Sequence, residues 1–308
     1  MPSRKPTRAV GPTIAGVTIT HPDRVVYPDV KVTKVMVAEY YARVADRLLP
    51  YVAGRPLSVV RCPEGVGAEC FFQKHVGRAR IPGVEIATIE DSAGPNPYIV
   101  ANTVKALAGL AQMNTLELHA WGAIGASIER PDTLVLDLDP DPQLAWGAVV
   151  AATRHVRALL EALGLHAFVK TTGGRGLHIV VPLQRHHGWD EIKHFAQCIA
   201  ARLARTSPER FTATMGETHR KGRIFVDYLR NARGATAVAP YSLRARAGAT
   251  VATPLSWDEL GVKSLPAGFT IATVPRRIAR NKDPWADYEK RRARLNAAML
   301  RAVQSRGT

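Results

Sequence analysis

Two aspartates separated by one leucine, Asp137 and Asp139, lie in the otherwise apolar run 133–140 (TLVLDLDP). Side chains alternate between the two faces of a β-strand, so both carboxylates point the same way. Adjacent carboxylates repel each other and are costly to desolvate, and a divalent cation relieves both costs. Hard oxygen ligands favour Mg²⁺ or Mn²⁺. From this fragment alone, a metal site and a strand that ends in solvent are equally good interpretations.

A third carboxylate, Asp227, interrupts a second apolar run, residues 224–229 (IFVDYL). A lone aspartate in such a strand either pairs with an arginine, here Arg230 or Arg233, or joins a metal site. Three carboxylates from two strands are what a two-metal phosphoryl-transfer site needs, because its two cations are held about 3.5–4 Å apart. Polymerases and nucleases both meet this requirement.

Residues 170–182 (KTTGGRGLHIVVP) combine three glycines with polar side chains between two predicted strands. The glycines allow several backbone N–H groups to converge on one anion. Thr172, Arg175 and His178 add a hydroxyl, a guanidinium and an imidazole, which suit phosphate oxygens. The loop is neither a Walker A motif nor a dinucleotide-binding fingerprint, because its spacing differs and a strand follows it. Taken alone, a glycine-rich hairpin of this kind is most often just a turn, and His178 fits a core histidine whose hydrogen bonds are satisfied.

The elements that would position these residues alternate between strands and helices. Hydrophobic periodicity predicts helices at 34–49, 144–163 and 191–205. It predicts strands at 134–139 and 223–229, and a strand, turn and strand over 166–181. Together they indicate an α/β or α+β core whose site residues lie on a sheet.

The rest of the chain is less regular. Residues 1–16 are expected to form a basic flexible tail, and prolines and glycines predict a loop-rich region to about residue 100. Residues 276–306 carry ten Lys or Arg and three Asp or Glu. Their composition after Pro284 predicts a terminal helix, whose basic face is either solvated or in contact with nucleic acid.

Composition excludes disorder, collagen and coiled coil as the main state, since 46% of the 308 residues are hydrophobic and 22% are charged. The net charge of +16 predicts a polyanionic partner, unless it reflects a host with Arg-rich proteins. No apolar run is long enough for a membrane span, and the N-terminus does not resemble a secretory signal. Cys62, Cys70 and Cys198 cannot all pair and lack zinc-site spacing, so we expect a reduced, cytosolic protein.

The order of the motifs (Asp-x-Asp, Gly-rich turn with histidine, single aspartate) resembles that of the archaeo-eukaryotic primase superfamily. Four further blocks are similar to the polymerase domain of bacterial ligase D, an enzyme of non-homologous end joining: 21–28 (HPDRVVYP), 54–63 (GRPLSVVRCP), 71–75 (FFQKH) and 234–246 (GATAVAPYSLRAR). The resemblance covers about residues 17–290.

This resemblance implies an α+β (mixed α/β) fold with a primase-type catalytic core, in which helices flank β-sheets. It implies one primase-polymerase domain at 17–300. Within it, a DNA-end-binding part would span about 17–115, the catalytic core about 116–250, and a basic helical segment about 276–306.

The resemblance also assigns roles to individual residues. Two divalent cations, Mn²⁺ or Mg²⁺, would be held by Asp137, Asp139 and Asp227. An incoming nucleoside triphosphate, NTP or dNTP, would contact Thr172, Gly173, Gly174, Arg175, His178, His119 and Arg244, with Lys74 and Arg61 nearby. DNA would contact Phe71 and Phe72 through template bases, and Arg24 and Lys34 through a downstream 5′-phosphate.

Each of these residues also has a structural interpretation without the family: core phenylalanines, surface charges, and a packed pair of His119 and Trp121. The chain departs from the family at three positions. Thr172 stands where serine is common, Arg175 where lysine is common, and Arg230 where glutamine is frequent. The first two changes keep the hydrogen-bonding type. The third puts a local nucleotide contact in doubt.

The implied activity is template-directed nucleotidyl transfer that fills gaps and extends primer ends with a preference for ribonucleotides. Its partners would be DNA with gaps, overhangs or a 5′-phosphate, Ku, and an ATP-dependent DNA ligase on the same or a separate polypeptide. The location would be the bacterial cytoplasm, at the nucleoid. The alternatives are a primase that starts strands de novo, a metal-dependent nuclease and a non-catalytic DNA-end-binding module. The glycine-rich turn and Arg244 favour a triphosphate over the nuclease, and clustered acids disfavour a pure DNA binder.

Overall fold

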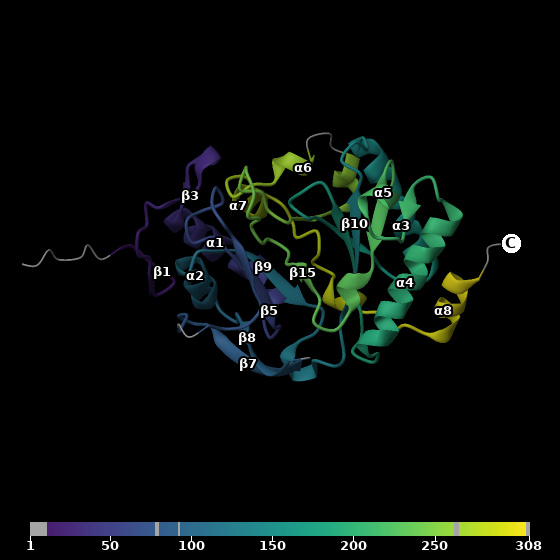
Figure 1. Cartoon of the computed structure of the whole chain (residues 1–308), viewed down its shortest axis with the longest axis horizontal. Coiled ribbons are helices and arrows are strands. Elements are labelled where there is room, and N and C mark those ends of the chain that lie inside the picture. Colours follow the sequence, from purple (N-terminus) through teal and green to yellow (C-terminus); the bar gives the residue numbers. More distant parts are fainter. Residues whose placement is uncertain (1–10, 78–79, 92, 262–264, 306–308) are drawn as a thin grey trace, which may run out of the picture.

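Two large β-sheets face each other at the centre of the molecule, and helices cover their outer faces (Figure 1). The structure is a computed structural model that describes residues 11–77, 80–91, 93–261 and 265–305. Most of the tail predicted at 1–16 therefore lies outside the described residues. At its end, β1 (Thr13–Ile14) pairs with β2 (Val17–Thr18), so the chain is already in a strand before residue 16.

The first large sheet, which we call the catalytic sheet, holds the predicted strands around the acids. Its neighbours are antiparallel except for one parallel pair at the edge. In spatial order the strands are β13 (Phe211–Thr212), β14 (Ile224–Asp227), β10 (Thr133–Pro140), β12 (Leu177–Pro182), β11 (Phe168–Thr171) and β16 (Pro254–Leu255). Its outer face is covered by α3 (Trp146–Ala162), α4 (Trp189–Thr206) and the C-terminal α8 (Ala297–Gln304) (Figure 1).

Side chains alternate along β10, so its leucines face the core and its aspartates face the other way. Leu134, Leu136 and Leu138 are fully buried in the cluster formed with α3 and α4. Each buried leucine contributes about 1.5–3 kcal/mol to folding. Asp137 and Asp139 therefore lie on the opposite face, toward the second sheet.

The second large sheet, which we call the cover sheet, includes four strands in the region predicted as loop. Its strands are β15 (Thr236–Val238), β9 (Thr115–Trp121), β5 (Leu57–Arg61), β8 (Gly94–Val100) and β7 (Glu85–Asp91) in spatial order, with β6 (Phe71–Gln73) paired to β5. Helices α1 (Lys34–Val52) and α2 (Val104–Gln112) pack in the core on one side of it.

The prediction of a loop-rich region up to residue 100 is wrong, and the prolines explain the error. Proline cannot donate to a sheet ladder, so it argues against a central strand. Strand β8 nevertheless contains Pro95 and Pro97, because it pairs with β5 only at Ile99. Its proline-containing part pairs with β7, and on the other side the Pro97 carbonyl accepts the Val76 N–H at 2.8 Å, a bond that needs no proline donor.

The basic C-terminal segment is also less helical than predicted. The helix expected after Pro284 begins only at Ala297. Before it, the Trp285 and Tyr288 side chains stack on each other with ring centroids 5.4 Å apart and are buried between the two sheets. The residues of this stretch thus bury aromatic side chains in the interior rather than forming one amphipathic helix.

The remaining elements are short. A small hairpin is formed by β3 (Val25–Tyr27) and β4 (Val32–Thr33). The short helices are α5 (Glu217–Arg220), α6 (Leu265–Gly268) and α7 (Val274–Arg280), and the single turns are η1 (Pro28–Val30), η2 (Gly125–Ser127), η3 (Leu229–Asn231), η4 (Trp257–Gly261) and η5 (Glu289–Arg291). Among the described residues, no helix combines the length and apolar character needed to cross a bilayer.

Candidate active site

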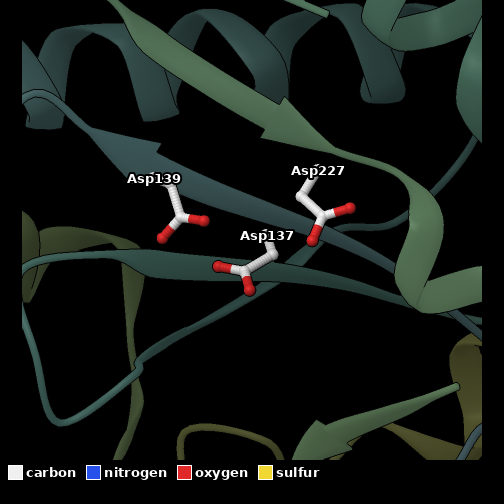
Figure 2. Close-up of side chains that lie close together, drawn as sticks. All are labelled: Asp137, Asp139 and Asp227. Atoms are coloured by element: carbon white, nitrogen blue, oxygen red, sulfur yellow. The ribbon is translucent and has the colours of Figure 1, made fainter. Parts of the chain in front are cut away.

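The three predicted acids meet on the inner face of the catalytic sheet (Figure 2). Register places Asp137 directly opposite Asp227 on the neighbouring strand, and Asp139 two residues further along β10. One carboxylate oxygen from each residue lies within 4.8 Å of the other two. Such an all-oxygen cluster suits a hard divalent cation.

Two further observations fit a cation at this cluster. Asp137 Oδ1 is buried and finds no hydrogen-bond partner among the described residues. Burial and the adjacent Asp137 and Asp227 carboxylates raise the pKa of Asp139 to about 6. Both the orphaned oxygen and the mutual repulsion are relieved by a divalent cation. The residues present therefore fit the metal site that the motif order implies.

His178 lies across the strand pair from Asp137 and holds one of its oxygens. Burial lowers the pKa of His178 to about 4, so the imidazole is neutral near pH 7. Its Nε2 lies 3.3 Å from Asp137 Oδ2, which fits a tautomer that donates from Nε2. Burial alone would raise the pKa of Asp137, but His178 and the Arg230 guanidinium outweigh it and lower that pKa to about 2. His178 is thus a partner of the acids.

A cleft of about 250 Å³ opens beside the acids, between the two sheets. Its walls carry several of the predicted nucleotide-binding residues together with two further cations. The lining includes His119, Asp137, Asp139, Thr172, Gly174, Arg175, His178, Arg230, Arg244 and Arg246. The cleft has acids on one side and guanidinium groups on the other. This arrangement is complementary in charge to a metal-bound polyphosphate, because the acids suit the cations and the guanidinium groups suit the phosphates.

The glycines of the turn make room for these arginines. Gly173 has a φ of +72°, and a Cβ there would lie 2.5 Å from Arg244 Cγ. Arg244 Nη1 donates to the Thr172 carbonyl, and the Thr250 hydroxyl donates to the Gly173 carbonyl at 2.6 Å. The Thr172 hydroxyl is engaged within the turn, donating to the Gly176 carbonyl at 3.1 Å. The turn is therefore tied to the segment that carries Arg244.

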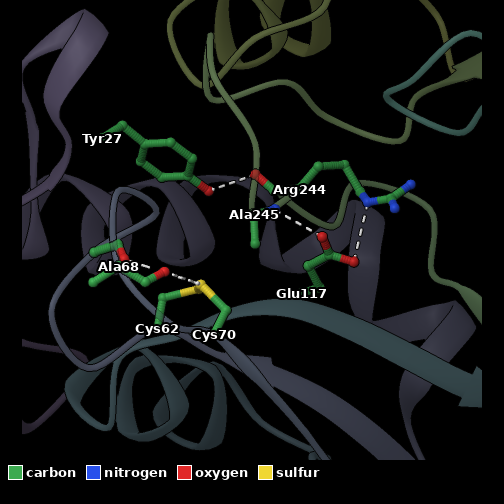
Figure 3. Close-up of a disulfide and its surroundings, with 8 residues drawn as sticks. Tyr27, Cys62, Ala68, Cys70, Glu117, Arg244 and Ala245 are labelled. Atoms are coloured by element: carbon green, nitrogen blue, oxygen red, sulfur yellow. Dashed lines mark hydrogen bonds and ion pairs between the residues drawn. A yellow bond between two sulfur atoms is a disulfide. The ribbon is translucent and has the colours of Figure 1, made fainter.

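Glu117 on β9 contacts both His119 and Arg244, two of the predicted nucleotide-binding residues. The sequence analysis did not identify Glu117. Its Oε2 lies 2.7 Å from His119 Nε2. The same oxygen lies 3.0 Å from Arg244 Nε, and Oε1 accepts the Ala245 N–H at 2.7 Å (Figure 3). Burial opposes its charge, but His119 and Arg244 together lower its pKa to about 2. Tyr27 holds the same segment by donating to the Arg244 carbonyl at 2.8 Å.

A disulfide lies near this network and corrects the expectation of reduced cysteines. Cys62 and Cys70 are joined with their sulfurs 2.04 Å apart (Figure 3), and Cys198 is free. The two cysteines flank the end of the β5–β6 pair, where Arg61 lies opposite Phe71. Antiparallel pairing brings them together, and the sequence analysis missed this because it predicted no strands here.

The remaining predicted residues lie outside the lining of the cleft. Phe71 and Phe72 on β6 are 42% and 48% exposed, far more than core phenylalanines would be. The Phe72 ring packs edge-to-face on His119, which lines the cleft, with centroids 5.5 Å apart. Arg61 lies over the Phe71 ring at 5.4 Å and donates to the Met113 carbonyl. Lys74 is exposed at the end of β6.

Arg24 and Lys34 form a separate basic pair at the start of α1. The Lys34 N–H donates to the Arg24 carbonyl at 2.9 Å. Lys34 is only 4% exposed, and burial together with the nearby Arg24 lowers its pKa to about 8. Arg24 donates to the Pro63 carbonyl at 2.8 Å and lies 3.5 Å from Glu64. A bound anion would relieve the repulsion between these two cations.

The cleft also contains two residues that the sequence analysis did not assign. Arg246 lines it, and the Arg-x-Arg spacing with Arg244 was the available signal. Arg230, noted above as a possible ion-pair partner of Asp227 and as a departure from the family, has its Nε 3.3 Å from Asp137 Oδ2 and 3.1 Å from Asp227 Oδ2. Its position one residue beyond a predicted strand end pointed toward the acids.

Comparison with known proteins agrees with this geometry. Residues 33–285 match the family described as the LigD primase-polymerase domain. The chain is 48% identical over 291 residues to the multifunctional non-homologous end joining protein LigD of Pseudomonas aeruginosa, covering 94% of this chain and 35% of that protein. It is 32% identical to the bifunctional LigD of Bacillus subtilis, covering 86% and 43% of the two chains. The chain thus spans less than half the length of these relatives.

A solved structure extends the match to three dimensions. The polymerase domain of Mycobacterium tuberculosis ligase D in complex with DNA superposes with a TM-score of 0.82 at 34% identity, covering 89% of this chain and 98% of that one. The fold and the acid-lined cleft define the class of protein, which is a nucleotidyltransferase with a primase-type catalytic core. The chain belongs to the LigD primase-polymerase domain family.

Proposed function

We propose that this domain fills gaps and extends primer ends during bacterial non-homologous end joining, using a two-metal mechanism and preferring ribonucleotides. The observation that supports this most is the acid cluster beside a guanidinium-lined cleft. Mn²⁺ or Mg²⁺ held by Asp137, Asp139 and Asp227 would activate the primer 3′-hydroxyl and neutralise the pyrophosphate leaving group.

The chain's own side chains would bind and orient the triphosphate. Arg175, Arg244 and Arg246 present fork-shaped donors to the cleft, and such donors suit phosphate oxygens. His178 would keep Asp137 in place by its hydrogen bond, and Glu117 would orient His119 and Arg244. Phe71 and Phe72 would stack on template bases, each worth about 1–3 kcal/mol and indifferent to sequence.

Replacing Glu117 with glutamine is expected to lower kcat/KM for the nucleotide by about 10–100-fold. The amide cannot hold the imidazole and the guanidinium as the carboxylate does, and a hydrogen bond to a charged group contributes about 1.5–3 kcal/mol. Most of the change should be an increase in KM. Steady-state primer extension at varied nucleotide concentration measures both KM and kcat. Glu129→Gln, which removes an exposed carboxylate paired with Arg233, is the matched control. Equal kinetics in both variants would contradict the role of Glu117.

Replacing Arg24 or Lys34 with alanine should weaken binding mainly to gapped DNA that carries a downstream 5′-phosphate. The two cations lie together, and their crowding is relieved by a doubly charged phosphate. Fluorescence anisotropy with phosphorylated and unphosphorylated gaps measures the difference. Lys31→Ala, an exposed lysine three residues away, is the control. Equal losses on both substrates would leave Arg24 and Lys34 as general backbone contacts.

Extension of a labelled primer on gapped duplex tests the proposed function directly. The reaction contains Mn²⁺ with either ribonucleotides or deoxyribonucleotides, and gaps with or without a 5′-phosphate. Extension that favours ribonucleotides and phosphorylated gaps supports end-joining gap filling. Shortened primers would instead indicate a nuclease, and tight binding without reaction would indicate a DNA-end-binding module. Ku and an ATP-dependent ligase are the partners we propose.

A further inference from the structure

Arg230 is the one described cation that forms ion pairs with two of the three acids. Its Nε lies 3.1 Å from Asp227 Oδ2 and 3.3 Å from Asp137 Oδ2. Asp139, the third acid, has no ion pair among the described residues. A single guanidinium therefore compensates the two facing carboxylates, whose repulsion would otherwise be large at this spacing.

The backbone of Arg230 is fixed while its side chain is not enclosed. Asn231, buried in the same turn η3, exchanges hydrogen bonds with both the N–H and the carbonyl of Val135 at 2.8 and 2.7 Å. The Leu229 N–H is held by Asp227 Oδ1 at 2.8 Å. The Arg230 side chain is nevertheless 42% exposed, and it lines the cleft. It is a tethered cation that can leave the carboxylates without unfolding its turn.

The same two oxygens are candidates to hold a divalent cation, so a guanidinium and a metal compete for them. A guanidinium carries one charge and a divalent cation carries two, and the latter also satisfies the orphaned Asp137 Oδ1. The cleft beside Arg230 is the place where an anionic triphosphate would be bound, so a displaced guanidinium has a new partner within reach.

Building on the proposed function, we propose that Arg230 is a displaceable counter-ion of the acid cluster. It holds Asp137 and Asp227 together in the metal-free protein, weakens their affinity for a divalent cation, and moves onto the triphosphate once the cation has taken its place. Arg230 thereby couples the binding of metal and nucleotide. Thermodynamic linkage requires this coupling to be reciprocal.

Mn²⁺ binding to the DNA-free and nucleotide-free protein tests the competition. Electron paramagnetic resonance of free Mn²⁺ gives the dissociation constant for wild type, Arg230→Gln, Arg230→Lys and Asp137→Asn at constant ionic strength. We expect Arg230→Gln to bind Mn²⁺ about tenfold more tightly than wild type. Arg230→Lys, which keeps the charge, should stay closer to wild type. Circular dichroism confirms that each variant is folded.

The outcomes separate this inference from the proposed function. If wild type and Arg230→Gln bind Mn²⁺ equally while Asp137→Asn binds it weakly, the metal site stands and the role of Arg230 is overturned. If Arg230→Lys binds as tightly as Arg230→Gln, charge is not the cause and the proposal fails. If Asp137→Asn binds Mn²⁺ like wild type, the metal site itself is overturned.

A second measurement tests the coupling. The affinity for a non-hydrolysable α,β-methylene analogue of ATP is compared with and without saturating Mn²⁺. In wild type the metal releases Arg230 toward the phosphates, so Mn²⁺ should increase analogue affinity by a larger factor than in Arg230→Gln. An equal factor in both proteins would overturn the coupling, because a residue with a purely structural role would leave that factor unchanged.

Discussion

Replacing Asp137 with alanine is expected to reduce primer extension by about 10³-fold or more while DNA binding stays equal or becomes tighter. Asp137 is the central acid of the cluster, since it faces Asp227 across the strand pair and His178 on the other side. Its loss would remove one of the three proposed oxygen ligands and also negative charge beside the proposed path of the phosphate backbone. Catalysis and binding should therefore change in opposite directions.

The measurement pairs extension of a gapped primer with anisotropy of the same DNA at two salt concentrations. Asp190→Ala is the matched control, because Asp190 lies exposed on α4 outside the lining of the cleft. It removes the same charge and should leave extension near wild type. Loss of DNA binding in Asp137→Ala, or substantial residual extension, would be inconsistent with a metal ligand at this position.

Replacing Asp132 with asparagine should lower the free energy of unfolding by about 3–5 kcal/mol. Asp132 is completely buried just before β10. Its carboxylate lies 2.7 Å from Arg55, 3.1 Å from Arg185 and 3.5 Å from Arg292. An amide leaves the buried Arg55 guanidinium without its counter-charge, and that uncompensated burial is the main cost.

Urea denaturation of both proteins measures this difference. Arg185→Gln removes the 41% exposed partner of the same carboxylate and should cost only about 0–1 kcal/mol. A loss in Asp132→Asn no greater than that of Arg185→Gln would show that the buried ion pairs contribute little.

The pH dependence of the same variant follows from the depressed pKa of Asp132. Burial opposes ionisation, but the surrounding arginines outweigh it and lower the pKa below its ordinary value. An unfolded aspartate titrates near pH 3.9, so the stabilisation by Asp132 is fully present above that pH. It is lost as the pH falls through the depressed folded pKa. The difference between wild type and Asp132→Asn should therefore narrow in acid.

Strand alternation placed Asp137 and Asp139 on one face, and the order of the three motifs favoured a metal site over a strand that ends in solvent. Asp137 and Asp139 share a face because the side-chain period of a strand is two, and Asp227 stood out because a charge in an apolar run needs a partner. The same reasoning located the glycine-rich turn between two strands. The comparisons confirm the α+β class and the family that the motif order implied.

Predictions from residues close together in the sequence failed where strand pairing or long-range contacts determine the secondary structure. Strands β5 to β8 are short and contain or adjoin proline and glycine, and only their pairing with β9 and with one another makes them a sheet. The Cys62–Cys70 disulfide depends on that same pairing. The segment after Pro284 forms turns and the short η5 rather than a regular helix, and its Trp285 and Tyr288 side chains fill the space between the sheets.

By itself, the sequence determined the strands that carry the acids, their common face and the turn that follows, because these depend on residues close together in the chain. The tertiary structure alone decided how β9 faces β10, and therefore that Glu117 holds His119 and Arg244 opposite the acids. It also decided that Arg230, which the sequence offered as a partner of Asp227, reaches Asp137 as well. The physical reason is that charge pairing across a cleft depends on distance in space, and spacing along the chain does not specify that distance.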